Sequence, residues 1–552
     1  MCGIWAVFGY HDYHQFMPSI MAIRGRGPDA FRTEPIPGFH NSRLAFHRLA
    51  IVGDVTGMQP MRIKQLPHLV LIYNGEIYNH KQLVTTFGFD MATTCDAEVI
   101  LHLYNKFGDV RRVAKLLDGV FAFSIVDSDS KQVHLGRDTF GVRPMFTLKE
   151  MFTERTTLAL SSEAKSLVLL EETFTGTGNG HKLALDPFPP GHYATFALST
   201  EGKLSLQEEG AYTYVGKIPT FDINFTPADD QMENIRRYLS EAVKKRLMAD
   251  RRIGCFLSGG LDSSLVAAIL TKHAKEAGID YPIQTFSIGL EGSTDLVAAR
   301  KVAKHIGSEH HEVIFTPEEG IQALRDVIYT LEIYDFDQIC PSVALYLLSK
   351  YVHENTETVV LYCGEGADEL CQGYVYFHKA PSAEMADQES RRLLKDLYLF
   401  DLVRVDRATA AFGLEARVPF LDVPFTSFFL SLPAVERQPR GGVEKWLLRA
   451  AYDGTGILPD EILWRTKTPF STGVSGSQPG KSWLEYIEVY AEHRVSDGEF
   501  ARASEFYEYN TPTSKVAFFC RKVFEEFFPG HQTLTPFMWL TQIRSLLQLA
   551  TK

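Results

Sequence analysis

The second part of the chain alternates between helical and strand periodicity, and this alternation limits the possible folds more than any other feature. Residues 232–248 have helical periodicity, 252–257 have an apolar strand pattern, 263–275 are helical again, and 283–288 have a second strand pattern. Strands that alternate with helices usually form a parallel sheet covered by helices. We therefore expect an α/β domain here, with a mostly helical C-terminal part after about residue 372.

The first part of the chain, roughly 200 residues long, has a different pattern. Short apolar or alternating runs bounded by Gly, Asp and Asn recur there, at residues 4–8, 44–52, 68–73, 120–126 and 132–135. Runs of this length and composition are typical of strands. This part is therefore predicted to be a layered domain dominated by sheets.

The length and the position of weakest periodicity suggest where the domains divide. A chain of 552 residues with 45% apolar composition is long enough for at least two domains. Periodicity is weakest between about residues 204 and 229, where Gly, Pro, Thr and Asp are interspersed. We expect one domain at 2–205, a linker at 206–230 and a second domain at 231–552.

Charge and cysteine content exclude several classes of protein. A formal net charge of −12 without a long basic run argues against a nucleic-acid partner. The 7 cysteines are scattered and include no CxxC pair, which favours a reducing compartment over a disulfide framework. Because the sequence contains neither a signal-peptide pattern nor about 18 consecutive apolar residues, we expect a cytoplasmic protein without a membrane partner.

A glycine-rich turn follows the first apolar strand pattern of the second part. The turn consists of Ser258, Gly259, Gly260, Leu261, Asp262, Ser263 and Ser264, and a helical pattern follows it. Paired glycines allow backbone N–H groups to approach an anion, and the helix N-terminus adds partial positive charge. The turn therefore predicts a pyrophosphate site in which Asp262 holds magnesium. The alternative is a glycine-rich turn with an ordinary helix cap.

A second polar loop follows another apolar run, at residues 359–362. It contains Cys363, Gly364, Glu365, Asp368 and Glu369. Parallel α/β sheets bind ligands at the carboxyl ends of their strands. Taken alone, this loop would more often be a capped helix start, but beside the first loop it makes Asp368 a candidate second ligand of magnesium.

The beginning of the chain is the third feature that offers reactive groups. Removal of Met1 would leave Cys2 with both a thiol and a free α-amine. The ordinary pKa values of these groups, about 8.5 and 7.7–8.0, are close enough to neutrality for a nucleophile and a base on one residue. Taken alone, a cysteine at this position would more often be chemically idle than reactive.

Five further motifs give these features a context. They are Arg26-Gly27-Pro28-Asp29, His47-Arg48-Leu49-Ala50, Tyr73-Asn74-Gly75-Glu76-Ile77-Tyr78-Asn79, Asp96-Ala97-Glu98 and Gly136-Arg137-Asp138. With Cys2-Gly3-Ile4, they are similar to the signatures of class II glutamine amidotransferases. Together with the turn at 258–264, they make nearly the whole chain resemble the glutamine-dependent asparagine synthetases. The resemblance implies an αββα N-terminal-nucleophile sandwich, a C-terminal ATP pyrophosphatase domain and a homodimer.

The resemblance also assigns roles to residues of the first domain. It implies that Cys2 attacks the side-chain amide of glutamine, while Asn74 and Gly75 form the oxyanion hole. Such donors stabilise a developing oxyanion, and the loss of one typically costs about 10²–10³ in rate. Arg48, Glu76 and Asp96 are implied to bind the glutamine.

In the second domain the resemblance implies an ATP site, a magnesium site and an acyl-adenylate site. Leu257, Ser287 and Ile288 would line the adenosine site, and Ser258, Gly259, Gly260, Asp262, Ser263, Cys363 and Gly364 would lie along the phosphates. Asp262 and Asp368 would hold Mg²⁺. Glu365 and Lys467 are the implied catalytic residues, and Asp401 and Arg404 would lie near the acyl-adenylate formed from ATP and aspartate.

Some positions depart from the family pattern, mainly in the second domain. Asp337 and Cys340 stand where the family usually has Thr and Arg, Cys363 replaces a Ser, and Thr468 replaces a Glu. Loss of one charge-assisted hydrogen bond of about 1.5–3 kcal/mol predicts a penalty of roughly 10- to 100-fold. The leading hypothesis is ATP-dependent asparagine synthesis. An amidotransferase for another carboxylic acid, and a catalytically impaired paralogue, are the alternatives.

Overall fold

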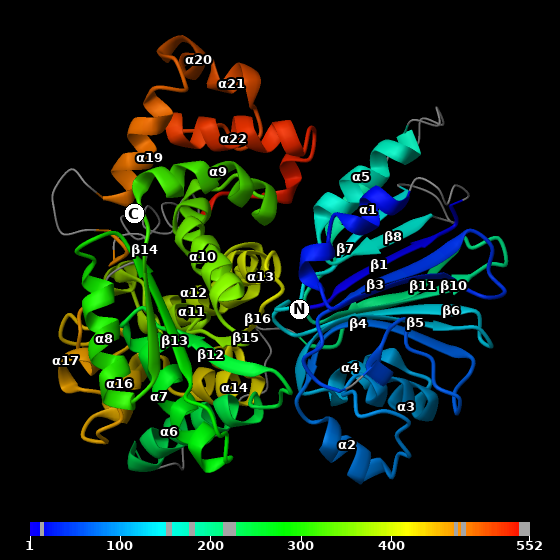
Figure 1. Ribbon diagram of the computed structural model, residues 1–552, viewed down its shortest axis with the longest axis horizontal. Coiled ribbons are helices and arrows are strands. Elements are labelled where there is room, and N and C mark those ends of the chain that lie inside the picture. The colour runs from blue at the N-terminus through cyan, green and yellow to red at the C-terminus, as the bar shows by residue number, and fades with distance from the viewer. Residues whose placement is uncertain are drawn as a thin grey trace. The chain divides into compact units, whose positions relative to one another are not determined.

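The computed structural model describes residues 1–10, 16–53, 55–150, 157–175, 183–213, 228–467, 473–475 and 482–539. The chain forms two compact units (Figure 1). The first comprises Met1–Lys217, Met248–Arg251 and Ala410–Leu414, and the second comprises Ile218–Leu247, Arg252–Thr409 and Glu415–Lys552.

Two antiparallel sheets form the centre of the first unit. The six-stranded sheet has the order β2 (Ala30–Pro35), β3 (Ser42–Arg48), β1 (Gly3–Phe8), β8 (Leu158–Ser161), β7 (Phe146–Glu150) and β9 (Leu183–Pro187). The five-stranded sheet has the order β11 (Leu204–Ala211), β10 (His192–Leu198), β6 (Gln132–Arg137), β5 (Gly119–Asp127) and β4 (Leu69–Ile77).

Helices cover the outer faces of both sheets, so the first unit has the predicted αββα layers (Figure 1). One pair contacts the six-stranded side: α1 (Phe16–Met21) and α5 (Ala164–Thr175). Three lie on the five-stranded side: α2 (His80–Phe87), α3 (Glu98–Phe107) and α4 (Val110–Leu116).

The alternation along β4 explains why these layers form. Leu69, Leu71 and Tyr73 belong to the apolar cluster beneath α3 and α4, whereas Val70 and Ile72 belong to the cluster between the two sheets. Successive side chains of a strand point to opposite faces, so a strand that is apolar throughout is buried on both.

Two boundaries in the first unit differ from the sequence predictions. The strand predicted at 44–52 ends at Arg48, where β3 stops. The linker prediction is wrong for its first residues, because Leu204–Ala211 forms the edge strand β11 beside β10. This strand exposes Gln207, Glu208 and Glu209, so it lacks the apolar alternation that identifies a strand. Residues 214–227 of the predicted linker lie outside the described residues.

The second unit contains the predicted parallel sheet. Its order is β14 (Glu309–Ile314), β13 (Gln284–Gly289), β12 (Arg252–Phe256), β15 (Thr358–Tyr362) and β16 (Glu415–Arg417), and every pair is parallel. The strand order reverses between β12 and β15, so the loops that follow these two strands diverge. Parallel α/β sheets bind ligands at such a switch point.

Among the described residues, five helices surround this sheet, and the first two begin within four residues of the predicted starts at 232 and 263. They are α6 (Ala228–Lys245), α7 (Leu261–Glu276), α8 (Thr294–Ile306), α9 (Pro317–Leu331) and α10 (Phe336–Asn355). A helical part follows β15, as predicted, and contains α11 (Ala367–Leu370), α12 (Ala383–Asp396), α13 (Asp401–Ala410), α14 (Val423–Ser431), α15 (Ala434–Arg437), α16 (Trp446–Tyr452), α17 (Asp460–Leu463), α19 (Trp483–Glu492), α20 (Asp497–Ala501), α21 (Ala503–Phe506) and α22 (Lys515–Phe527). Within the described ranges, every helix is too short or too polar to cross a membrane.

Candidate functional site

Cys2 lies immediately before β1, and hydrogen bonds to its carbonyl and its thiol hold it in place. The Arg26 Nε–H donates a hydrogen bond to the Cys2 carbonyl at 3.0 Å, and the Leu49 N–H donates to Cys2 Sγ at 3.4 Å. The side chain is half-buried and packs against the apolar cluster between the two sheets. Backbone and thiol are therefore both fixed, as a nucleophile requires.

Arg26 belongs to a buried group of three charged side chains. Arg26 Nη1 lies 2.8 Å from Glu163 Oε1, and Lys165 Nζ lies 2.6 Å from Glu163 Oε2. All three side chains are less than a tenth exposed. Breaking a buried ion pair typically costs about 3–5 kcal/mol, so Glu163 fixes the guanidinium that holds Cys2.

Asn74 and Gly75 lie inside β4, where Asn74 follows Val70 and Ile72 on the face toward the six-stranded sheet. Asn74 is fully buried, and its side-chain nitrogen and oxygen have no hydrogen-bond partner within the described part of the chain. Gly75 has φ +157°, and a Cβ there would lie 2.1 Å from the Val120 carbonyl. The pair is thus not a hairpin turn. The free amide suits an oxyanion donor.

The residues predicted to bind glutamine gather around Cys95, which the sequence prediction missed. Burial, together with the charges of Asp96, Glu76 and Cys2, raises the pKa of Cys95 well above its ordinary value. An added Cβ at Gly57 would lie 3.1 Å from Cys95 Cβ and 3.2 Å from Arg48 Nη2. All of these groups therefore face one region.

Asp96 is the best-fixed carboxylate of this region. Its Oδ2 accepts hydrogen bonds from the Ile77 N–H at 2.7 Å and from the Tyr73 hydroxyl at 3.1 Å. Arg48 Nη2 donates to the Gly53 carbonyl at 3.2 Å. A buried carboxylate and a fixed guanidinium together can select the ammonium and carboxylate groups of an amino acid.

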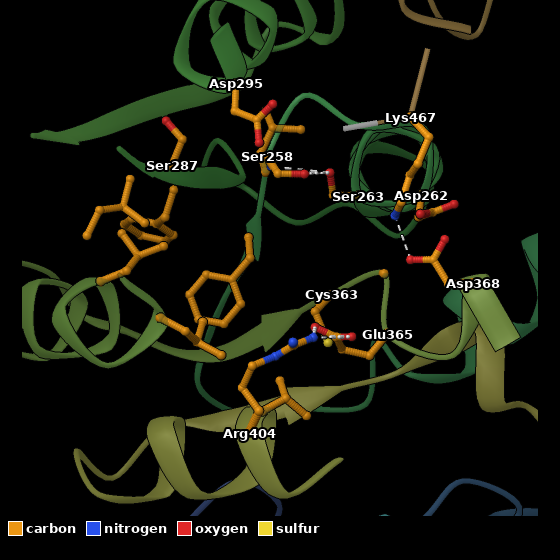
Figure 2. A pocket seen from close by; sticks show the side chains of 18 residues that line it. Ser258, Asp262, Ser263, Ser287, Asp295, Cys363, Glu365, Asp368, Arg404 and Lys467 are labelled. Carbon is orange, nitrogen blue, oxygen red and sulfur yellow. Dashed lines mark hydrogen bonds and ion pairs between the residues drawn. The ribbon is translucent and has the colours of Figure 1, made fainter. Parts of the chain in front are cut away.

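A pocket opens at the switch point of the second unit (Figure 2). The predicted residues that line it are Leu257, Ser258, Asp262, Ser263, Ser287, Ile288, Cys363, Gly364, Glu365, Asp368, Arg404 and Lys467. Gly260 lines an adjoining cavity, which shares Ser258, Asp262 and Lys467 with the first. Gly259 and Asp401 contribute to neither lining. Figure 2 shows the apolar side chains on one side and the charged groups on the other.

The glycine-rich turn has the geometry of an anion site. Gly260 N–H donates to Ser258 Oγ at 3.3 Å, and Ser258 N–H donates to Ser263 Oγ at 3.2 Å. Gly259 has φ +72°, and a Cβ there would lie 2.5 Å from the Ala299 nitrogen. The helix α7 begins at Leu261, so its N-terminus points at the pocket entrance formed by the turn.

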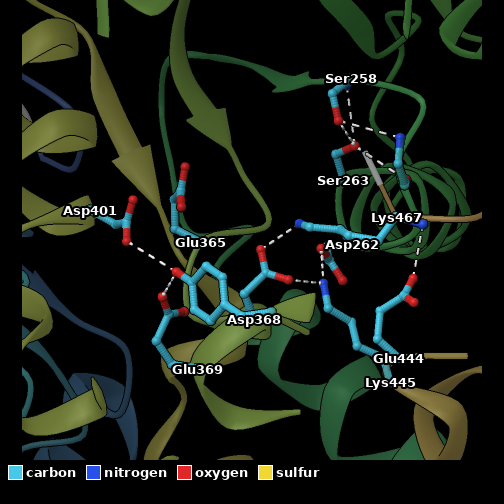
Figure 3. A network of polar contacts seen from close by, with 12 residues as sticks. Ser258, Asp262, Ser263, Glu365, Asp368, Glu369, Asp401, Glu444, Lys445 and Lys467 are labelled. Atoms are coloured by element: carbon cyan, nitrogen blue, oxygen red, sulfur yellow. Dashed lines mark hydrogen bonds and ion pairs between the residues drawn. The ribbon is translucent and has the colours of Figure 1, made fainter. Parts of the chain in front are cut away.

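Carboxylates and lysines alternate in the charged part of the pocket (Figure 3). Lys467 Nζ lies 2.6 Å from Asp368 Oδ2, and Lys445 Nζ lies 2.5 Å from Asp368 Oδ1. Lys445 also forms an ion pair with Asp262. Burial opposes ionisation of Asp368, but Lys445 and Lys467 hold the pKa of this carboxyl well below its usual range.

These carboxylates fit a magnesium ion that nucleotide phosphates help to bind. Asp262 Oδ1 is buried and accepts no hydrogen bond within the described residues. Mg²⁺ usually takes one or two carboxylates plus substrate phosphates and waters, not a cage of protein ligands alone. The described residues contain no cluster of three or more His, Cys, Asp or Glu side chains arranged for a metal.

Arg404 connects the acidic loop with α13. Its Nη2 lies 3.0 Å from Glu365 Oε1 and 2.7 Å from Asp401 Oδ1. Burial raises the pKa of Glu365, although Arg404 opposes the shift. The Tyr374 hydroxyl forms hydrogen bonds with both Glu369 and Asp401 (Figure 3). Asp401 therefore belongs to this polar network although it does not line the pocket.

Three further pocket residues escaped the sequence prediction. Lys445 lines the adjoining cavity, and no sequence motif assigned it a role. Asp295 lines the pocket and accepts a hydrogen bond from Arg465 Nη2 at 2.8 Å. Arg465 Nη1 donates to the Gly259 carbonyl at 3.1 Å, which fixes the turn. Lys445 and Arg465 lie outside regular helices and have no periodic signal, and Asp295 lies in the first turn of α8, where an acidic residue is ordinary.

Comparison with known proteins identifies the family. The model of the family described as asparagine synthase matches residues 234–392 and 381–551, and that of the glutamine amidotransferase domain matches residues 1–182. Proteins named asparagine synthetase (glutamine-hydrolyzing) from Bos taurus and Homo sapiens are each 50% identical to the chain, over 98% of it and 96% of their own length. The chain belongs to the asparagine synthase family. Asp337, Cys340, Cys363 and Thr468 are therefore departures from the pattern of the family to which the chain belongs.

Asp337 and Cys340, which depart from the asparagine synthase pattern, lie near the start of α10. Asp335 Oδ1 accepts a hydrogen bond from the Asp337 N–H at 3.1 Å, so the Asp335 side chain caps the helix. Cys340 is buried, and its carbonyl accepts a hydrogen bond from Trp483 Nε1 at 2.9 Å. Neither residue lines the described pockets. Thr468 lies outside the described residues.

Proposed function

We propose that this chain makes asparagine from aspartate, using ATP and the ammonia released from glutamine. Glutamine and water would give glutamate and ammonia; ATP and aspartate would give β-aspartyl-AMP and pyrophosphate; ammonia would then displace AMP. The observation that carries the proposal is 50% identity to glutamine-hydrolysing asparagine synthetases over 98% of the chain. The glutamine-hydrolysing part and the synthetase part of the reaction therefore each correspond to a matched part of the chain.

The residues of the first unit would carry out glutamine hydrolysis. After removal of Met1, the Cys2 thiolate attacks the side-chain amide carbon, and the α-amine of Cys2 transfers the proton to the leaving ammonia. The Asn74 amide and the Gly75 N–H stabilise the oxyanion. Asp96 and Arg48 orient the glutamine, with Glu76 beside them. Water then hydrolyses the thioester to glutamate.

The residues of the second unit would activate aspartate. The apolar side of the pocket, with Leu257 and Ile288, takes the adenosine, and the turn from Ser258 to Ser263 takes the phosphates. Asp262 and Asp368 would hold Mg²⁺, which when bound neutralises phosphate charge.

Two cationic side chains would then serve the acyl transfer itself. Lys467, 2.6 Å from Asp368, balances charge as pyrophosphate leaves. Arg404, held by Glu365 and Asp401, lies on the opposite side of the pocket, where it would orient the acceptor acid. Glu365, whose burial raises its pKa, is the candidate for accepting a proton from the attacking ammonia.

The substitutions at the start of α10 motivate a second candidate, an amidotransferase for a different carboxylic acid, although neither residue lines the described pockets. Cys340 and Asp337 remove a cation and add a carboxylate relative to the family pattern. The retained Asp262, Asp368 and Lys467 oppose a complete loss of ATP chemistry. A cytoplasmic location and a homodimer stay predictions from the sequence.

The deciding experiment measures pyrophosphate release with ammonium, ATP and Mg²⁺, using protein whose N-terminal Cys2 is verified. Aspartate-dependent release matched by asparagine would establish the synthetase. Release that requires another acid would establish the second candidate. A protein that hydrolyses glutamine but releases no pyrophosphate with any acid would contradict both.

A further inference from the structure

Lys445 has an unusual position for a lysine. Its backbone lies in the left-handed region, with φ +55°, immediately before α16, and its side chain is only 1% exposed. The ammonium group lies between two carboxylates, those of Asp262 and Asp368 (Figure 3). A strained backbone that buries a charge persists only where the surroundings determine it closely.

Two features of its surroundings hold Lys445 in this conformation. The neighbouring Glu444 accepts hydrogen bonds from the Lys467 N–H at 2.9 Å and from Arg449 Nη2 at 2.8 Å, so the segment is attached on both sides. A Cβ at Gly373 would lie 2.0 Å from Asp368 Oδ1 and 2.1 Å from Lys445 Cε. Only glycine at position 373 leaves room for the lysine beside Asp368.

The ammonium of Lys445 occupies the space that a cation bound to both carboxylates would need. Asp262 and Asp368 together have two negative charges, and Lys445 and Lys467 together have two positive charges. A divalent ion alone would therefore enter a neutral cluster and would meet a fixed cation at short range. Nucleotide phosphates supply the negative charge that makes its entry favourable.

We propose that Lys445 is a positioning residue that makes divalent-cation binding at Asp262 and Asp368 depend on the nucleotide. In the free protein it holds the two carboxylates together as their counter-ion. When phosphates arrive with the metal, the carboxylates exchange the ammonium for the ion, and Lys445 turns to the phosphates. This inference rests on the proposed function only in placing the metal at these two carboxylates.

The test is Mn²⁺ binding to the full chain, measured by electron paramagnetic resonance without nucleotide and with α,β-methylene-ATP. The wild-type protein is expected to bind Mn²⁺ weakly alone and tightly with the analogue. Lys445→Met should tighten binding without nucleotide by at least 10-fold and shrink the effect of the nucleotide by the same factor. Lys301→Met, which removes an exposed lysine paired with Glu461, should change neither value.

Gly373→Ala provides a second variant in case Lys445→Met does not fold. Its added methyl group pushes Lys445 away from Asp368 but retains every charge, so Mn²⁺ binding without nucleotide should tighten in the same direction. Unchanged or weaker Mn²⁺ binding in a folded variant of either kind would overturn the role of Lys445. Unaltered Mn²⁺ binding with nucleotide in Asp262→Asn and Asp368→Asn would instead overturn the metal site itself.

Discussion

Because the buried amide of Asn74 has no partner among the described residues, we predict that its removal lowers the rate of glutamine hydrolysis but maintains or raises stability. Asn74→Ala removes an oxyanion donor, and in known cases such a loss lowers kcat by about 10²–10³, or about 2.7–4 kcal/mol. It also removes a buried amide with no partner among the described residues. An unsatisfied buried polar group costs about 1–3 kcal/mol, and its removal outweighs or balances the small cavity left by alanine.

The assay separates the two half-reactions. Glutamate release from glutamine should fall by about 10²–10³ in Asn74→Ala, whereas ammonium-driven pyrophosphate release should stay within about 2-fold. The melting temperature of the first unit should equal or exceed that of the wild type. For a unit of this size each kcal/mol corresponds to roughly 2–4 °C.

Asn79 is the matched control. Its side chain donates to the Leu116 carbonyl at 2.9 Å and accepts from the Asp118 N–H at 3.0 Å, so it is a structural asparagine. Asn79→Ala should lower the melting temperature by several degrees and leave kcat for glutamine nearly unchanged. The reasoning would be refuted if Asn74→Ala kept more than about a tenth of glutaminase activity, or melted like Asn79→Ala.

Three other predictions concern the first unit. Cys2→Ala should abolish glutamine-dependent synthesis and spare ammonium-dependent synthesis; equal loss of both would contradict the division of labour. Glu163→Gln should destabilise the unit by about 3–5 kcal/mol in urea unfolding and slow Cys2 alkylation, because it removes the carboxylate shared by Arg26 and Lys165; the added change Lys165→Met should recover part of the loss. Burial, opposed by Asp127, lowers the pKa of His134 to about 4. The unfolded chain, with a histidine pKa near 6.5, then binds more protons, so about 3 kcal/mol of stability should be lost as pH falls from 6.5 to 4. His134→Gln should flatten this pH dependence, and an unchanged slope would exclude His134 as its source.

The two phosphate-side loops show how far local pattern reaches. Asp262 and Asp368 were predictable because each follows an apolar strand and lies in the first turn of a helix, a signal contained in about ten residues. Their closeness was not, since it depends on β12 and β15 being neighbours, with about a hundred residues between them in the chain. Lys445 joins them from an irregular segment before α16, where no periodicity marks it.

Asn74-Gly75 and β11 show where the local sequence pattern predicts the wrong structure. Asn-Gly is the preferred pair of a hairpin turn, yet here both residues continue β4, because the neighbouring strand β5 pairs with them directly. Strand β11 forms although its sequence is polar, because β10 offers it hydrogen-bond partners. In both cases pairing with a distant strand overrides local preference.

The family resemblance implied the αββα layering of the first unit. By itself, the sequence pattern determined the alternation of elements, a sheet-dominated first domain, a parallel sheet in the second, and the identity of the reactive groups at Cys2 and on the two loops. These follow from side-chain periodicity and from residue chemistry, which are local. Only the tertiary structure decided which charges are paired, which amide is left free and which lysine lies between two carboxylates. Those outcomes depend on burial and on contacts between segments far apart in the chain, because a charge or an amide acquires its energy from what replaces water around it.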